Sequence, residues 1–120
     1  MKDWNSWNYS DLLFYKGKKI GVFTLISPNG LQAKITNFGG RIVSMKVPDR
    51  NGIMRDVVHG FSSLADYFPE NHLTDFGATI GRYANRIAGG NLTIDGKFFQ
   101  LPQNNGHNCL HGGPDGWQYA

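Results

Sequence analysis

The sequence contains very little cysteine and no long hydrophobic run. Its single cysteine, Cys109, cannot form a disulfide within the chain, which favours a reducing compartment. No stretch approaches the ~20 apolar residues that a membrane-spanning helix requires. Residues 1–19 contain polar residues where a signal peptide would need a continuous apolar core. We therefore expect a cytoplasmic protein with no membrane partner.

Positive charge is present but is not concentrated in the sequence. Twelve basic side chains stand against nine acidic ones, for a formal net charge of +3. The only tight basic group is Lys16, Lys18 and Lys19. Proteins that bind nucleic acid usually gather basic residues on one face with aromatic residues between them. The scattered charge therefore predicts no nucleic-acid partner.

Nucleotide-binding motifs are also missing, although the segment GRYANRIAGG (residues 81–90) is rich in glycine. It matches neither G-x-G-x-x-G nor G-x-x-x-x-G-K-[ST], and no long helix follows that could offer its N-terminus to a phosphate. We expect no nucleotide or other cofactor. One interpretation of the segment is structural: Gly81, Gly89 and Gly90 relieve crowding at bends, while Arg82 and Arg86 point to solvent.

A metal site is conceivable around residues 107–111, where His107, Cys109 and His111 would share one side of a strand. A tetrahedral site needs a fourth ligand, and the remaining histidines, His59 and His72, stand in unrelated sequence contexts. No paired C-x-x-C spacing supports them. The prediction is that the chain holds no metal.

Frequent turn signals separate short runs of branched and aromatic residues, a pattern typical of antiparallel β-structure. Apolar and polar residues alternate in 31–36 and again in 43–47, which predicts half-buried strands with Thr36 and Ser44 on the solvent-exposed face. The evenly apolar run 20–26 predicts a strand covered on both faces. No repeat or linker divides the chain. We predict an all-β fold, a sandwich or barrel, with no domain boundary within residues 1–120.

Two local elements can be predicted more closely. Asp95-Gly96 is suited to a type I′ turn, so residues 91–101 are expected to form a tight hairpin. Residues 61–76 contain the only plausible helical piece. Ser62 or Ser63 could cap one or two turns that end before Pro69.

The polar residues around the glycine-rich segment suit a ligand covered in hydroxyl groups. Arginine offers a fixed fork of donors, and asparagine and neutral histidine each offer a donor and an acceptor. Asn85, Arg86 and His111 would form a sugar-binding trio if the fold brought them together. Apolar platforms for a sugar ring could come from aromatic side chains, although each is also suited to a core: Trp117, Tyr83 and Phe76.

The segments FGATIGRYANRIAGG and LTIDGKFFQLPQNNGHNCLHGG, together with NFGGRIVSMKVPDRNG and DVVHGFSSLADYF, resemble the N-terminal part of the aldose 1-epimerases, also called galactose mutarotases. The resemblance runs in order from about residue 18 to 117. It implies an antiparallel β-sandwich of the galactose mutarotase type, here as an incomplete N-terminal portion. It also implies an isomerase that interconverts the α and β anomers of aldohexoses such as galactose and glucose without a cofactor, using an acid and a base.

Carried over by motif, the resemblance makes Asn85 and Arg86 ligands of substrate hydroxyls, and His111 a histidine near the sugar that assists binding or polarisation. The family's main acid, a second histidine, its base, a glutamate, and an aspartate ligand lie beyond the matched region. His107 does not replace the second histidine. His59 stands where the family usually has leucine and is expected to be a tolerated side chain. We therefore expect a truncated product with little activity alone.

Three hypotheses remain open from the sequence. The first is part of an aldose 1-epimerase. The second is a carbohydrate-binding β-domain that binds sugar through Asn85, Arg86 and His111 without turnover. The third is a structural β-domain, or an inactive fragment, whose arginines are solvated. Sheet edges that are left uncovered in such a fragment would also favour self-association.

Overall fold

The computed structural model describes residues 6–120, which fall into two compact units. The first runs through Ala78 and the second comprises Thr79–Ala120. The expectation that residues 1–120 belong to one domain without a boundary stays a prediction.

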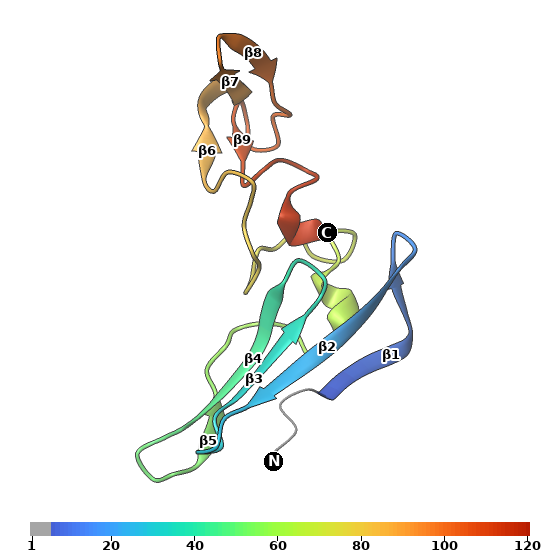
Figure 1. Ribbon diagram of the computed structural model, residues 1–120, viewed down its shortest axis with the longest axis vertical. Helices are drawn as coiled ribbons and strands as arrows, with labels where there is room; N and C mark the ends of the chain where they lie inside the picture. The colour runs from blue at the N-terminus through green and yellow to red at the C-terminus, as the bar shows by residue number, and fades with distance from the viewer. Residues whose placement is uncertain (1–5) are drawn as a thin grey trace. The chain divides into compact units, whose positions relative to one another are not determined.

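The first unit is built on a five-stranded antiparallel sheet in which each strand pairs with the next along the chain (Figure 1). The strands are β1 (Ser6–Tyr15), β2 (Lys18–Ile26), β3 (Gln32–Thr36), β4 (Arg41–Pro48) and β5 (Met54–Asp56). A short 3₁₀ helix, η1 (Leu64–Tyr67), follows the sheet. This meander is the all-β, antiparallel architecture that the sequence predicts.

The second unit contains two small antiparallel pairs, seen at the orange and red end of the chain in Figure 1. In one pair β6 (Arg86–Ile87) lies beside β9 (Cys109–Leu110), and in the other β7 (Asn91–Ile94) lies beside β8 (Lys97–Gln100). Two 3₁₀ helices, η2 (Ala88–Gly90) and η3 (Trp117–Tyr119), complete the unit. The β6–β9 pair is the element that matters for function, because it carries the predicted site residues.

The predicted hairpin and the predicted short helical piece are both confirmed. Strands β7 and β8 form the hairpin, and its two turn residues, Asp95 and Gly96, have φ angles of 50° and 74°. Positive φ at both central positions is what a type I′ turn requires. In η1 the Ser63 hydroxyl accepts a hydrogen bond from the Ala65 backbone N–H at 3.3 Å, so Ser63 is the cap.

The prediction of the solvent-exposed faces of β3 and β4 is wrong at two positions. Thr36 is 1% exposed and Ser44 is 7% exposed, so both are buried, whereas Ile35 is only half-buried. The pairing between β3 and β4 shifts register between Lys34 and Ile35. The extra residue of this bulge lies on β4, so it does not change the alternation of β3. Thr36 is buried with its hydroxyl accepting from the Phe38 backbone N–H at 3.2 Å, and Ser44 is buried where it lines one pocket with Phe61 and Tyr67.

An aromatic cluster forms the core of the first unit. The rings of Tyr15, Phe38 and Phe68 lie 4.7–5.0 Å apart between centroids. Edge-on and tilted arrangements at such separations stabilise a core beyond simple area burial. The cluster joins the end of β1 to the turns that follow β3 and η1.

A fully buried arginine lies against the same core. Arg41 is 0% exposed, and its guanidinium carbon lies 5.4 Å from the ring centroid of Phe38 and 5.5 Å from that of Tyr67. Its Nη1 donates to the carbonyls of Thr74 and Phe76 at 3.0 and 3.1 Å. A buried cation is tolerated only when it is paired or hydrogen-bonded. Arg41 therefore fixes the segment around residue 75 to the start of β4.

Candidate functional site

The pairing of β6 with β9 brings the three predicted site residues together. Arg86 lies opposite Leu110 in the pair, Asn85 immediately precedes β6, and His111 immediately follows β9. The His111 backbone N–H donates to the Asn85 carbonyl at 3.0 Å. Residues that are 26 positions apart in the sequence are thus direct neighbours across the strand pair.

The backbone of Asn85 and that of His111 are both in the left-handed region, with φ angles of 65° and 53°. In this conformation the Asn85 backbone N–H donates to His111 Nδ1 at 2.9 Å. A ring nitrogen that accepts a hydrogen bond carries no proton, so the proton of the neutral imidazole lies on Nε2. His111 therefore presents an N–H donor at the outer end of its ring.

Two neighbouring amides hold the guanidinium of Arg86. Its Nε donates to Asn105 Oδ1 at 2.9 Å, and its Nη1 donates to Asn85 Oδ1 at 3.4 Å. These bonds use two of the five N–H donors of an arginine, so the remaining donors lie on the terminal nitrogens. Because the Asn85 oxygen accepts from Arg86, the other end of that amide, Nδ2, is its donor end. The cluster of Asn85, Arg86 and His111 thus offers N–H groups on all three side chains.

The loop of residues 103–108 supports this cluster from one side. Asn104 makes two bonds to the backbone of Leu110, with Nδ2 donating to the carbonyl at 3.0 Å and Oδ1 accepting from the N–H at 2.7 Å. Gln103 Nε2 donates to the Gly89 carbonyl at 2.9 Å. Asn104 and Asn105 were not predicted from the sequence to be site residues. The signal that could have pointed to them was the run of amide side chains around the Asn-Gly turn.

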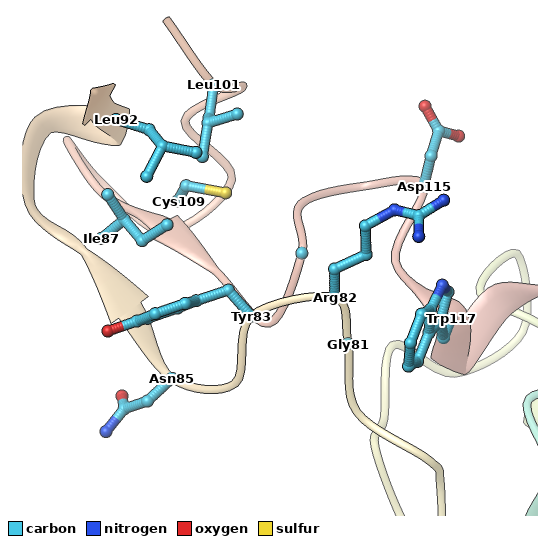
Figure 2. A pocket seen from close by; sticks show the side chains of 11 residues that line it. Gly81, Arg82, Tyr83, Asn85, Ile87, Leu92, Leu101, Cys109, Asp115 and Trp117 are labelled. Carbon is cyan, nitrogen blue, oxygen red and sulfur yellow. The ribbon is translucent and has the colours of Figure 1, made fainter. Parts of the chain in front are cut away.

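A pocket of about 360 Å³ lies next to the cluster, within the second unit. It is lined by Gly81, Arg82, Tyr83, Asn85, Ile87, Leu92, Leu101, Cys109, Gly112, Asp115 and Trp117. Figure 2 shows the side chains of Ile87, Leu92, Leu101 and Cys109 gathered on one side of this pocket. The Asn85 amide points away from them. Arg86 and His111 do not line the pocket. The hydrogen-bonding cluster and the apolar pocket are therefore neighbours that share Asn85.

Two of the three aromatic residues suggested as platforms line this pocket. Tyr83 and Trp117 are 58% and 44% exposed, and the Arg82 guanidinium carbon lies 5.7 Å from the Trp117 ring. Phe76 belongs to the first unit, where its ring lies 4.8 Å from that of His59. Tyr83 and Trp117 are thus the exposed aromatic surfaces next to the cluster.

The residues considered for a metal site have other surroundings. Cys109 is buried, and His111 Nδ1 accepts the Asn85 N–H. His59 and His72 lie in the first unit, where their rings pack against aromatic side chains. Within residues 6–120, no group of three or more His, Cys, Asp and Glu side chains is placed to hold a metal ion.

Asp56, on the sheet of the first unit, is a carboxylate that accepts hydrogen bonds from three donors. It accepts from the Ser44 hydroxyl at 2.5 Å and from the backbone N–H groups of Met45 and Val58 at 3.0 and 3.1 Å. The Ser44 bond, followed by the two backbone bonds, lowers the pKa of Asp56 from its ordinary value of 3.8. This group ties β5 to β4 and lies in the first unit, whereas the cluster lies in the second.

The fold and the cluster together define an antiparallel β-protein whose polar surface donates hydrogen bonds from amide, guanidinium and imidazole groups. The family model "Aldose 1-epimerase" matches residues 21–119, which include every residue of the cluster. The chain belongs to the aldose 1-epimerase family. The family resemblance seen in the sequence is thus confirmed.

Named relatives agree with the family model. The chain is 46% identical over 87 residues to a galactose mutarotase of Sus scrofa, covering 72% of this chain and 25% of that protein. It is 34% identical over 110 residues to an aldose 1-epimerase of Escherichia coli, covering 92% of this chain and 31% of that protein. Epimerases and mutarotases of this kind are isomerases.

A solved structure confirms the fold. A GalM/aldose epimerase homologue from C. elegans superimposes with a TM-score of 0.79 at 37% identity, covering 84% of this chain and 30% of that one. The galactose mutarotase type of β-fold, present as its N-terminal part, is therefore confirmed. The chain spans about a quarter to a third of the length of these relatives. Among the described residues, none of the helices has the length and apolar character to cross a membrane.

Proposed function

We propose that the cluster of Asn85, Arg86 and His111 is part of the sugar site of an aldose 1-epimerase. The reaction is the interconversion of the α and β anomers of an aldohexose such as galactose or glucose. The observation that carries the proposal is the hydrogen bond from the Asn85 N–H to His111 Nδ1, which joins the two halves of the cluster. We further propose that the protein acts in the cytoplasm and uses no cofactor.

The chemistry of the cluster suits binding and polarisation of sugar oxygens. Ring opening needs an acid to protonate the ring oxygen and a base to remove the proton from the C1 hydroxyl. The N–H groups of Arg86 and Asn85 can donate to hydroxyl oxygens, and His111 Nε2–H can donate to an oxygen near the anomeric carbon. Such donors stabilise negative charge that develops on oxygen as the ring opens.

The same geometry argues that the cluster does not supply the base. A base needs a lone pair that can accept the C1 proton, and the basic nitrogen of His111, Nδ1, already accepts the Asn85 N–H. Arginine and amide groups are not bases at neutral pH. We therefore assign His111 an auxiliary role, and place the main acid and base on residues other than these three.

Sugar titration followed by residue-resolved NMR tests this proposal. Galactose should shift the signals of residues 85, 86 and 111, and Arg86→Ala should weaken binding by about 10- to 100-fold, because a charge-assisted hydrogen bond contributes ~1.5–3 kcal/mol. Arg50→Ala is the matched control, since Arg50 is an exposed arginine in the first unit, whereas the cluster lies in the second. Equal losses in the two variants would contradict a specific role for Arg86.

A non-catalytic carbohydrate-binding β-domain is the second candidate, and the donor-only character of the cluster favours it. Polarimetry on freshly dissolved α-galactose separates the two functions. An acceleration proportional to protein concentration supports an epimerase, whereas sugar binding without acceleration supports the binding domain. If Arg86→Ala and His111→Ala leave every sugar measurement unchanged, the chain is a structural β-domain.

A further inference from the structure

The loop of residues 103–108 has more hydrogen bonds to the site than a connecting turn needs. Four of its six residues carry amide side chains, and each amide bonds to a residue outside the loop. Three of these bonds go to backbone groups of Gly89 or Leu110. The exception is Asn105, whose amide oxygen accepts from the side chain of Arg86.

We propose that Asn105 is a positioning residue that fixes the plane of the Arg86 guanidinium, so that its terminal N–H groups are directed at sugar oxygens. This inference rests on the sugar-binding role proposed for Arg86. Asn105 acts through Arg86 and is not assigned a contact with the sugar. Its amide would therefore set affinity and selectivity without taking part in the chemistry.

The geometry supports this role. Arginine has a long flexible stem, and a hydrogen bond at Nε, where the planar group begins, restricts rotation of the whole plane. The Asn105 bond to Nε is 2.9 Å long, whereas the bond from Nη1 to Asn85 is 3.4 Å long. The shorter bond is the stronger restraint. With Nε occupied, the outward edge of the guanidinium is the one formed by its terminal nitrogens.

Asn105 is itself held by its backbone. Its N–H donates to the Asn108 carbonyl at 3.1 Å, and its carbonyl accepts from the Asn108 N–H at 3.0 Å, which closes the turn. The two bonds of Asn104 to Leu110 then attach the turn to β9. The acceptor for Arg86 is therefore carried on a fixed backbone. A preorganised donor loses less conformational entropy when a ligand binds.

The direct test is the solvent exchange of the Arg86 Nε–H proton, measured by ¹⁵N-resolved NMR on the full chain without sugar. The signal is assigned with Arg86→Lys. In the wild type we expect slower exchange than for Arg50, an exposed arginine. Asn105→Ala should speed Arg86 exchange about tenfold, as expected when a charge-assisted hydrogen bond is lost. Asn105→Asp keeps the acceptor oxygen and should keep the protection.

Galactose affinity gives the second readout. Asn105→Ala should weaken binding about fivefold to tenfold with the backbone spectrum preserved, Asn105→Asp should restore it, and Asn105→Ala should add little in an Arg86→Ala background. Asn51→Ala, at an exposed asparagine in the first unit, is the control. If the Arg86 Nε–H proton of the wild type exchanges with solvent as fast as that of Arg50, the proposal is overturned, even if Asn105→Ala fails to fold. Equal exchange rates of this proton in the wild type and in the Asn105 variants also overturn it. If the wild type binds no galactose, the proposed function fails, while the exchange experiment still decides whether Asn105 positions Arg86.

Discussion

Replacing His111 by asparagine should separate the structural role of this side chain from its role towards the sugar. The δ atom of the side chain accepts the Asn85 N–H, and the ε nitrogen offers the outward donor. Asparagine places an oxygen at the δ position but has no ε atom. After glycine, it is among the residues that best tolerate the positive φ of 53° found here. We expect His111→Asn to keep the first role and lose the second.

The magnitudes follow from the same two features. His111→Ala loses the acceptor, which costs about 0.5–1.5 kcal/mol, and places alanine in a left-handed conformation at a further cost of about 0.5–1 kcal/mol. Its free energy of unfolding should therefore fall by about 1–2.5 kcal/mol. His111→Asn should change this quantity by less than about 0.5 kcal/mol. Both variants should lose galactose affinity to a similar degree.

Urea unfolding followed by the amide signals of residues 85–111 is the appropriate assay, because the chain contains two compact units and a global probe would average them. A long-range ¹H–¹⁵N spectrum of the imidazole gives an independent check. The proton should be found on Nε2. If it is found on Nδ1, or if asparagine destabilises the unit as much as alanine does, the reasoning about His111 is refuted.

Three further predictions concern packing, pH and association. A Cβ on Gly81 would lie 2.2 Å from Trp117 Cε3, so Gly81→Ala should lower the free energy of unfolding by about 1–3 kcal/mol. The loss should be much smaller in a Trp117→Ala background. Urea unfolding of the wild type, the two single variants and the double variant measures both effects. The pKa of Asp56 is lowered in the folded chain, so its stabilisation is present above the ordinary value of 3.8 and is lost as pH falls through the folded pKa. Asp56→Asn should remove this loss of unfolding free energy at low pH, which amounts to less than about 1 kcal/mol because Asp56 is exposed. If the unfolding free energy of the wild type and of Asp56→Asn depends on pH in the same way, this prediction is contradicted. We also expect self-association through uncovered sheet edges, visible as a concentration-dependent mass in light scattering; a constant monomer mass would count against it.

Local sequence chemistry was sufficient to predict some elements. Asp95-Gly96 fixed its hairpin because two adjacent residues decide the turn, and Ser63 capped η1 because the bond spans two positions. The burial of Ser44 could not be predicted, because Phe61 and Tyr67, which line one pocket with it, lie 17 and 23 residues further along the chain. Nor could the burial of Arg41, since its acceptors lie 33 and 35 residues further along the chain.

The site shows the same division between local and long-range information. Donor chemistry indicated Asn85, Arg86 and His111, but their hydrogen-bonding states depend on contacts that no local pattern contains. The Asn85 N–H decides which imidazole nitrogen of His111 carries the proton, and Asn105 and Asn85 take two of the Arg86 donors. The result is a cluster that donates and does not act as a base. A reaction that must remove a proton from a sugar hydroxyl therefore requires a basic group from outside this cluster.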